Sequence, residues 1–176
     1  MNMIGIVGSI RKDSIHRQIF NHYSEISQDH FELTEGVIAD IPMYDGEGMD
    51  NPVVQNLASQ ILAADGVIFI APEYNYSIPG VLKNAIDWLS RCEPQPLAGK
   101  PATIIGASPG NVGTARMQYH LRQVGVFLDL RFMNKPEVMI AGAFGKLENG
   151  KISDDSTIEF LERHAAAFAT FSQSNN

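Results

Sequence analysis

Three stretches of the chain are apolar at nearly every position. They are "MIGIVG" (residues 3–8), "GVIFIA" (residues 66–71) and "PATIIGA" (residues 101–107). A strand covered by helices on both faces has no solvent-facing side, so its sequence runs apolar without alternation. These runs therefore predict the central strands of a parallel sheet between two helical layers.

Helical spacing separates these runs. Residues 14–26 place Ile15, Ile19 and Tyr23 four positions apart on one stripe, and Ser14 is a suitable N-cap. Similar stripes predict four more helices, and two weaker apolar segments predict two more strands. The additional predicted helices span residues 51–64, 78–92, 114–128 and 156–171, and the additional strands span residues 31–38 and 135–142.

Strands and helices alternate along the chain, five of each. Right-handed crossovers then predict an α/β fold, a doubly wound five-stranded parallel sheet of order 2-1-3-4-5 between helix layers. We expect one domain over residues 1–176. In such a sheet, the loops at residues 8–13, 72–79 and 108–113 leave the carboxyl ends of neighbouring strands, where this architecture binds its ligands.

Composition narrows the class of protein. The chain has 176 residues, 44% of them hydrophobic, and a formal net charge of −7. An acidic chain without a long apolar run is a poor candidate for binding nucleic acid or for entering a membrane. Because Cys92 is the only cysteine, no disulfide forms within the chain, and we expect a cytoplasmic location.

The first loop, "GSIRKDSIH" (residues 8–16), has the chemistry of an anion site. Ser9 and Ser14 supply hydroxyls, and Arg11 supplies a guanidinium group. The amides of Ser14, Ile15 and His16 are expected to point out of a helix N-terminus, which favours a phosphate. The patterns GxGxxG and GxxxxGK[ST] are absent, which favours a monophosphate, although a plain strand-to-helix turn with a serine cap remains an alternative.

The second loop, "PEYNYSIPG" (residues 72–80), is too dense in special residues for a simple turn. Pro72 and Pro79 stiffen the path, which would aim the amides of Tyr74 and Asn75 at fixed points. Tyr74 and Tyr76 offer flat faces for a ring. Beside a phosphate loop, this combination favours a ligand with a planar group, and the alternative is that the tyrosines only cover the end of the sheet.

Three motifs in these segments resemble the motifs of a known protein family. "GSIRKDS", "PEYNYSIPGVLKNAIDW" and "LAGKPATIIGASPGNVGTARMQYHLRQV" resemble the family of NADPH-dependent FMN reductases, and within it the bacterial chromate and quinone reductases. The resemblance extends over about residues 3–140. It implies a flavodoxin-like fold that binds FMN without a covalent bond.

The resemblance also implies a set of cofactor-binding residues. His16 stands where many relatives have Asn, and "ASPGNVG" departs from their "SSxGxxGG" because Pro109 replaces a small polar residue. The expected FMN-binding residues are Ser9, Arg11, Ser14, Ile15, His16, Pro72, Glu73, Tyr74, Asn75, Tyr76, Ser108 and Gly110.

The implied activity is a ping-pong cycle. A hydride passes from NADPH or NADH to flavin N5, and electrons then pass to a small-molecule acceptor such as a quinone, chromate, an azo or nitro compound, or free flavin. FMN carries this chemistry, so no catalytic side chain is expected. The resemblance further implies a homodimer or homotetramer, in which Arg91, Tyr119 and Glu137 match positions that such reductases use between subunits.

Two other classes of protein stay open at this point. One is a flavodoxin-like electron carrier without NAD(P)H turnover, and the other is a non-flavin binding module or glycosyl-bond enzyme with Glu73 as its reactive carboxylate. A metal site is not expected, because no two histidines pair at one-turn helical spacing. The five histidines, which we expect on solvated helix faces, are His16, His22, His30, His120 and His164.

Overall fold

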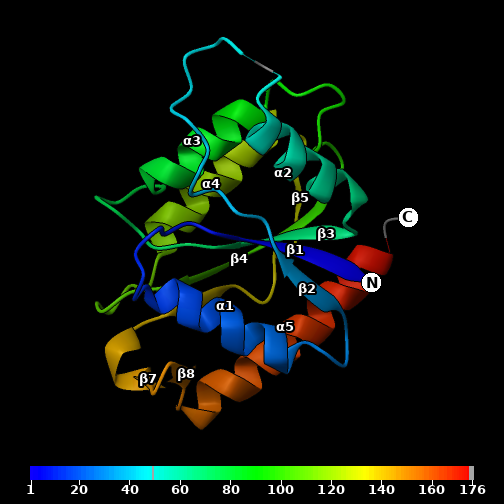
Figure 1. Ribbon diagram of the computed structural model, residues 1–176. Coiled ribbons are helices and arrows are strands. Elements are labelled where there is room, and N and C mark those ends of the chain that lie inside the picture. The colour runs from blue at the N-terminus through cyan, green and yellow to red at the C-terminus, as the bar shows by residue number, and fades with distance from the viewer. Residues whose placement is uncertain (49, 175–176) are drawn as a thin grey trace.

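The structure is a computed structural model that describes residues 1–48 and 50–174. A central parallel sheet separates two helical layers (Figure 1). Its elements are β1 (Asn2–Val7), α1 (Ile15–Ile26), β2 (Glu32–Glu35), α2 (Pro52–Ala63), β3 (Gly66–Ile70), α3 (Gly80–Leu89), β4 (Pro101–Ala107), α4 (Ala115–Phe127), β5 (Arg131–Phe132), β6 (Val138–Ile140), η1 (Ala143–Lys146), β7 (Leu147–Glu148), β8 (Lys151–Ile152) and α5 (Asp155–Gln173).

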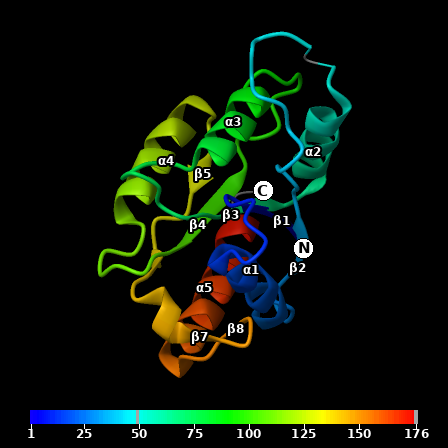
Figure 2. The same ribbon diagram turned by 60° about the vertical axis from the view of Figure 1, so that its left-hand side comes forward.

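The strand order is β2-β1-β3-β4-β5, and every neighbouring pair in it is parallel. This confirms the predicted fold class. Helices α2, α3 and α4 cover one face of the sheet, and α1 and α5 cover the other (Figures 1 and 2). The carboxyl ends of β1, β3 and β4 therefore meet at one edge, as predicted.

The fifth position in the sheet differs from the prediction, because two short strands share it. β5 pairs with the start of β4 at Pro101 and Ala102, and β6 pairs with its end at residues 105–107. The predicted strand at residues 135–142 is reduced to β6. The two residues of β5 carry no strand pattern of their own, so only pairing with β4 makes them a strand.

Two other predicted elements are shorter than expected. The predicted strand at residues 31–38 is reduced to β2, and the predicted helix at residues 78–92 becomes α3. Pro79 explains the later start of α3, because the residue before a proline is disfavoured in the helical conformation, so Ile78 stays outside the helix and Pro79 occupies the N-cap.

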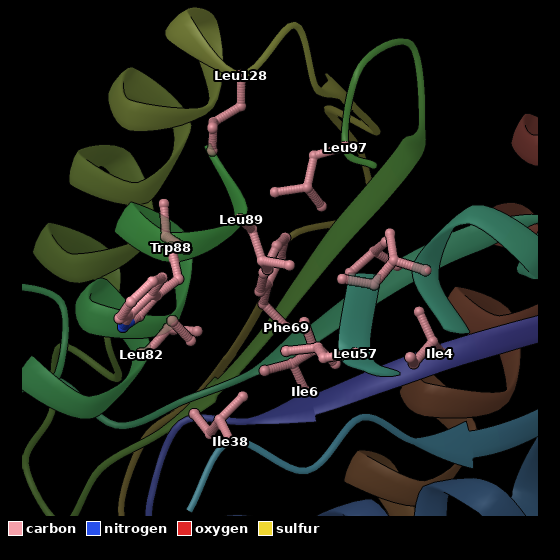
Figure 3. Close-up of a cluster of buried hydrophobic side chains, with 14 of the residues drawn as sticks. Ile4, Ile6, Ile38, Leu57, Phe69, Leu82, Trp88, Leu89, Leu97 and Leu128 are labelled. Carbon is pink, nitrogen blue, oxygen red and sulfur yellow. The ribbon is translucent and has the colours of Figure 1, made fainter. Parts of the chain in front are cut away.

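The core lies on both faces of the sheet. β3 and β4 are buried along their whole length, which explains their unbroken apolar sequences. Figure 3 shows the cluster beneath α2, α3 and α4, where Phe69 of β3 lies among leucines and isoleucines from the helices and neighbouring strands. Trp88 belongs to this cluster and donates from Nε1 to the carbonyl of Pro42 (2.8 Å).

Three polar side chains that are joined by hydrogen bonds are buried on the opposite face of the sheet. His164 of α5 has no exposed surface, and its two ring nitrogens lie 2.8 Å from the hydroxyls of Tyr23 and Thr103. Burial lowers the pKa of His164 to about 3, so the ring is neutral. The expectation that the histidines lie on solvated faces is wrong for this residue. His164 instead bridges α1, α5 and β4.

Candidate functional site

The loop after β1 begins pressed against the neighbouring strand. The Gly8 amide donates to the carbonyl of Ile70 (2.9 Å), and a Cβ atom on Gly8 would lie 2.7 Å from Cβ of Ala71. Any side chain here would push the two loops apart. Glycine at this position therefore allows the β1 and β3 loops to leave the sheet side by side.

Ser14 fixes the other end of this loop. It is the N-cap of α1, and its hydroxyl accepts from the amide of His16 (3.2 Å). The Ser14 amide donates to the carbonyl of Arg11 (3.2 Å). The expectation of three free amides is therefore wrong for Ser14 and His16, because both already have acceptors. Within the described residues, the Ile15 amide keeps no such acceptor.

The ring of His16 faces inward and ties α1 to the end of β4. It is 3% exposed, and its Nε2 accepts from the amide of Ala107 (3.3 Å). Burial lowers the pKa of His16 to about 4. An accepting Nε2 places the proton of the neutral ring on Nδ1. His16 is thus the second histidine that is buried rather than solvated, and its position links the first loop to the third.

The loop after β3 is a tight turn with a strained backbone. The amides of Tyr74 and Ser77 donate to each other's carbonyls (3.1 and 3.0 Å), and Asn75 and Tyr76 have φ angles of 50° and 66°. Two consecutive positive φ angles are typical of a type I′ turn, which non-glycine residues adopt at a cost. Because the Tyr74 amide is used inside the turn, it is not free for a ligand, contrary to the sequence-based expectation.

Glu73 anchors this loop to α4. Its side chain is 6% exposed, and Oε1 lies 2.6 Å from a guanidinium nitrogen of Arg116. Its Oε2 accepts from the amide of Met117 (3.1 Å), in the first turn of α4. The Arg116 guanidinium lies 3.6 Å from the ring centroid of Tyr76. With both oxygens engaged, Glu73 is a structural anchor, which removes the support for a glycosyl-bond enzyme.

The loop after β4 is held from the far side by the chain beyond β6. The backbone amide of Ser108 donates to the carbonyl of Ile140, and the backbone carbonyl of Ser108 accepts from the amide of Ala143, both at 3.0 Å. Gly142 donates to the carbonyl of Gly110 (3.2 Å). These hydrogen bonds hold η1 next to the third loop at the edge of the sheet. Phe144, which belongs to η1, therefore lies near the site.

The three loops enclose a cleft of about 220 Å³. It brings together nine of the twelve predicted residues. They are Ser9, Arg11, Ser14, Ile15, His16, Pro72, Glu73, Tyr74 and Ser108. The other three, Asn75, Tyr76 and Gly110, line an adjoining cleft beyond Glu73 and Ser108.

Four further residues line the main cleft, namely Asp13, Ala107, Pro109 and Phe144. Phe144 is 68% exposed and comes from a segment that the sequence did not connect with the site. No local pattern marks it, because only the hydrogen bonds between η1 and the third loop bring it there.

The residues that line the cleft are of two kinds. The loop after β1 supplies Ser9, Arg11 and Ser14, and the other segments supply Tyr74, Pro109 and Phe144. Such a lining suits a ligand that carries both a phosphate and a flat ring, as FMN does. Among the described residues, no three histidine, cysteine or acidic side chains gather as a metal site would require.

Fold and cleft together define a flavodoxin-like protein with a candidate ligand site at the carboxyl edge of its sheet. The sequence profile of the family described as NADPH-dependent FMN reductase matches residues 1–145. The chain belongs to this family.

Individual relatives agree along almost the whole chain. A quinone reductase of Escherichia coli is 44% identical over 180 aligned positions, which cover 98% of this chain and 96% of the relative. An NAD(P)H-dependent FMN reductase of Pseudomonas aeruginosa is 43% identical over 172 positions, covering 95% of this chain and 92% of the relative.

A solved structure extends the agreement to three dimensions. The flavoenzyme NAD(P)H:(acceptor) oxidoreductase FerB of Paracoccus denitrificans superimposes with a TM-score of 0.90 at 32% identity, covering 99% of this chain and 98% of the other. The described part of this chain contains no helix long and apolar enough to cross a bilayer.

Proposed function

We propose that this chain is an FMN-dependent NAD(P)H oxidoreductase whose electron acceptors are quinones. The observation that carries the proposal is one cleft that combines an arginine and serine hydroxyls with aromatic side chains, at the edge where the fold binds ligands. The names of the relatives support it, because they include a quinone reductase and an NAD(P)H-dependent FMN reductase.

In this proposal the chain's own residues bind and orient. Ser9, Ser14 and Arg11 hold the phosphate of FMN, and Tyr74 with Pro72 forms the wall beside its ring. His16, which does not ionise near neutral pH, holds the Ala107 end of β4 in place and forms part of the lining of the cleft. Bound FMN would supply the redox chemistry, accepting hydride from NAD(P)H and reducing the acceptor.

The distribution of charge supports a phosphate position beside Arg11. The side chains of Arg11 and Lys12 make no ion pair or hydrogen bond in the part of the chain that the structure describes, and the acidic Glu35 in their neighbourhood is paired with Arg17. A phosphate dianion would balance this local excess of positive charge. Glu73 adds no net repulsion at the ring end, because Arg116 neutralises it.

The assembly and the location are also proposals. We expect a homodimer or homotetramer, since α4 leaves Tyr119, Val126 and Phe127 58%, 79% and 75% exposed. Tyr119 donates to Glu137 (3.3 Å) on the same surface. Light scattering on a sizing column tests this. A cytoplasmic location fits the free, buried Cys92.

The deciding experiment is an anaerobic mixture of the FMN-loaded protein with NADPH, followed at the visible flavin band. We expect rapid bleaching, then recovery of the band when a quinone is added. A yellow protein that stays oxidised with both NADPH and NADH would identify an electron carrier instead. Failure to take up FMN would refute the assignment of the cleft. Chromate, azo and nitro compounds and free flavin stay predictions from the resemblance.

A further inference from the structure

A second cleft lies on the other side of the β1 loop. It has a volume of about 160 Å³ and shares Ser9 and Arg11 with the main cleft. Its other lining residues come from the end of β1 and its loop, from the first turn of α1, and from the end of β2 and the segment after it. The side chains that matter below are Ile10, Lys12, Arg17, Glu35 and Val37. Because the two clefts share a wall, a ligand in one lies next to a ligand in the other.

Positive charge at this edge of the sheet collects in this second cleft. Three of its lining residues, Arg11, Lys12 and Arg17, are basic, and Glu35 is the only acidic one. Arg17 is paired with Glu35 and lies 5.8 Å from the ring centroid of Phe20.

Neither Arg11 nor Lys12 forms an ion pair among the described residues. At the opposite side of the main cleft, Arg116 is already neutralised by Glu73. In a chain with a net charge of −7, the unpaired cations at the ligand-binding edge are thus concentrated on one loop. If the FMN phosphate engages Arg11, Lys12 remains for a second anion.

The apolar walls indicate what accompanies that anion. Ile10 and Val37 flank the cations and are 60% and 48% exposed. A bare oxyanion would leave both side chains in water, whereas a nucleoside phosphate would cover them with its base. The combination of exposed apolar surface and unpaired ammonium therefore fits a nucleoside phosphate.

We propose that this second cleft binds the adenosine 2′-phosphate of NADPH, and that Lys12 makes the chain prefer NADPH over NADH. The proposal rests on the proposed function, in which the nicotinamide lies at the flavin ring and the rest of the dinucleotide binds to a neighbouring surface. NADH has a 2′-hydroxyl where NADPH has the phosphate, so only NADPH gains the charge-assisted contact with Lys12.

The test compares the FMN-saturated wild-type protein with Lys12→Gln. The control is Lys135→Gln, which removes the same charge from an exposed lysine that lines neither cleft. The quantity measured is kcat/KM for NADPH divided by kcat/KM for NADH. We expect Lys12→Gln to lower this ratio about tenfold, the size of one partly screened charge-assisted contact, and the control to leave it within twofold of wild type.

A second readout requires no turnover. Adenosine 2′,5′-bisphosphate should bind the FMN-loaded protein in calorimetry, and Lys12→Gln should weaken that binding by a similar factor. Adenosine 5′-monophosphate, which lacks the 2′-phosphate, should bind with the same affinity to both. This readout tests the cleft even if neither nucleotide bleaches the flavin, a result that would refute the proposed function and not the cleft.

Two results would overturn the proposal. One is an unchanged nucleotide ratio in Lys12→Gln together with unchanged binding of the bisphosphate. The other is a loss of FMN affinity in Lys12→Gln with no change in the ratio, because Lys12 would then serve the FMN phosphate and not a second ligand.

Discussion

The two buried histidines make the stability of this protein depend on pH. In the unfolded chain, a histidine has a pKa near 6.5, whereas burial lowers the pKa of His16 to about 4 and that of His164 to about 3. Below pH 6.5, the unfolded state therefore takes up protons that the folded state excludes. The stability contributed by the neutral rings is fully present above pH 6.5 and is lost as the pH falls toward the folded-state pKa values.

The size of this loss in stability follows from the interval between the unfolded-state and folded-state pKa values of each histidine. Each pH unit between the two pKa values costs about 1.4 kcal/mol per histidine, so lowering the pH from 6.5 to 5 costs roughly 2 kcal/mol for each and about 4 kcal/mol together. This is a large share of the about 5–15 kcal/mol that stabilises a typical domain. Urea unfolding of the FMN-free protein at pH 7, 6 and 5 measures the loss directly.

Variants assign the effect to particular residues. His164→Gln removes one titrating ring and should reduce the pH dependence by about half, whatever it does to stability at pH 7. His30→Gln, at an exposed histidine, should leave the dependence unchanged. A difference below about 1 kcal/mol between pH 7 and pH 5, or an equal slope in wild type and His164→Gln, would refute the reasoning.

Three substitutions test the loops. Arg11→Ala should weaken FMN binding by about 1.5–3 kcal/mol, measured by flavin fluorescence, and unchanged affinity would rule out the phosphate-loop assignment. Glu73→Ala should lower the free energy of unfolding by about 2 kcal/mol, because it removes a helix cap and an ion pair that is partly screened, whereas Glu73→Gln keeps an acceptor and should cost about 1 kcal/mol. Equal losses would show that the cap contributes nothing. Gly106→Ala would place a Cβ atom 1.6 Å from the hydroxyl of Thr114. It should cost about 1–3 kcal/mol in urea unfolding, while Gly80→Ala, with no atom within 4 Å, serves as the control and should cost nothing.

The parts of the fold that the sequence predicted are those with a local signal. β3 and β4 are buried on both faces, so their apolar runs are unbroken. Ser14 caps α1 through its own side chain, and that preference is also local. In contrast, β5 and β7 are two residues long and exist through pairing with distant segments, which no sequence pattern announces.

The burial of His164 has a signal in the sequence, namely its position in the helical period. His164 is followed at three, four and seven residues by Ala167, Phe168 and Phe171, and it lies with Leu161 on the inner stripe of α5. A histidine on such a stripe is buried with its helix face. The residue type of histidine favours a solvated position, but the helical period is the stronger signal, because burial follows the face of the helix and not the residue type.

The positions of the three loops were predictable because strand order alone decides them. The contacts within the loops could not be predicted from the sequence. The use of Glu73 depends on where α4 begins relative to β3, and the use of Phe144 depends on η1 returning to the third loop. Both are consequences of tertiary packing between segments far apart in the sequence.

The turn at residues 74–77 shows why the second loop is so dense in special residues. Tyr76 adopts a positive φ angle of 66°, a conformation that costs a bulky residue free energy. Its ring stacks with Arg116, which Glu73 holds through an ion pair, and Glu73 in turn caps α4. One half of the loop thus stabilises the strained half through α4. All of these contacts are made within the chain itself, so they restrain the conformation of the loop and reduce the free energy that ligand binding would spend on ordering it.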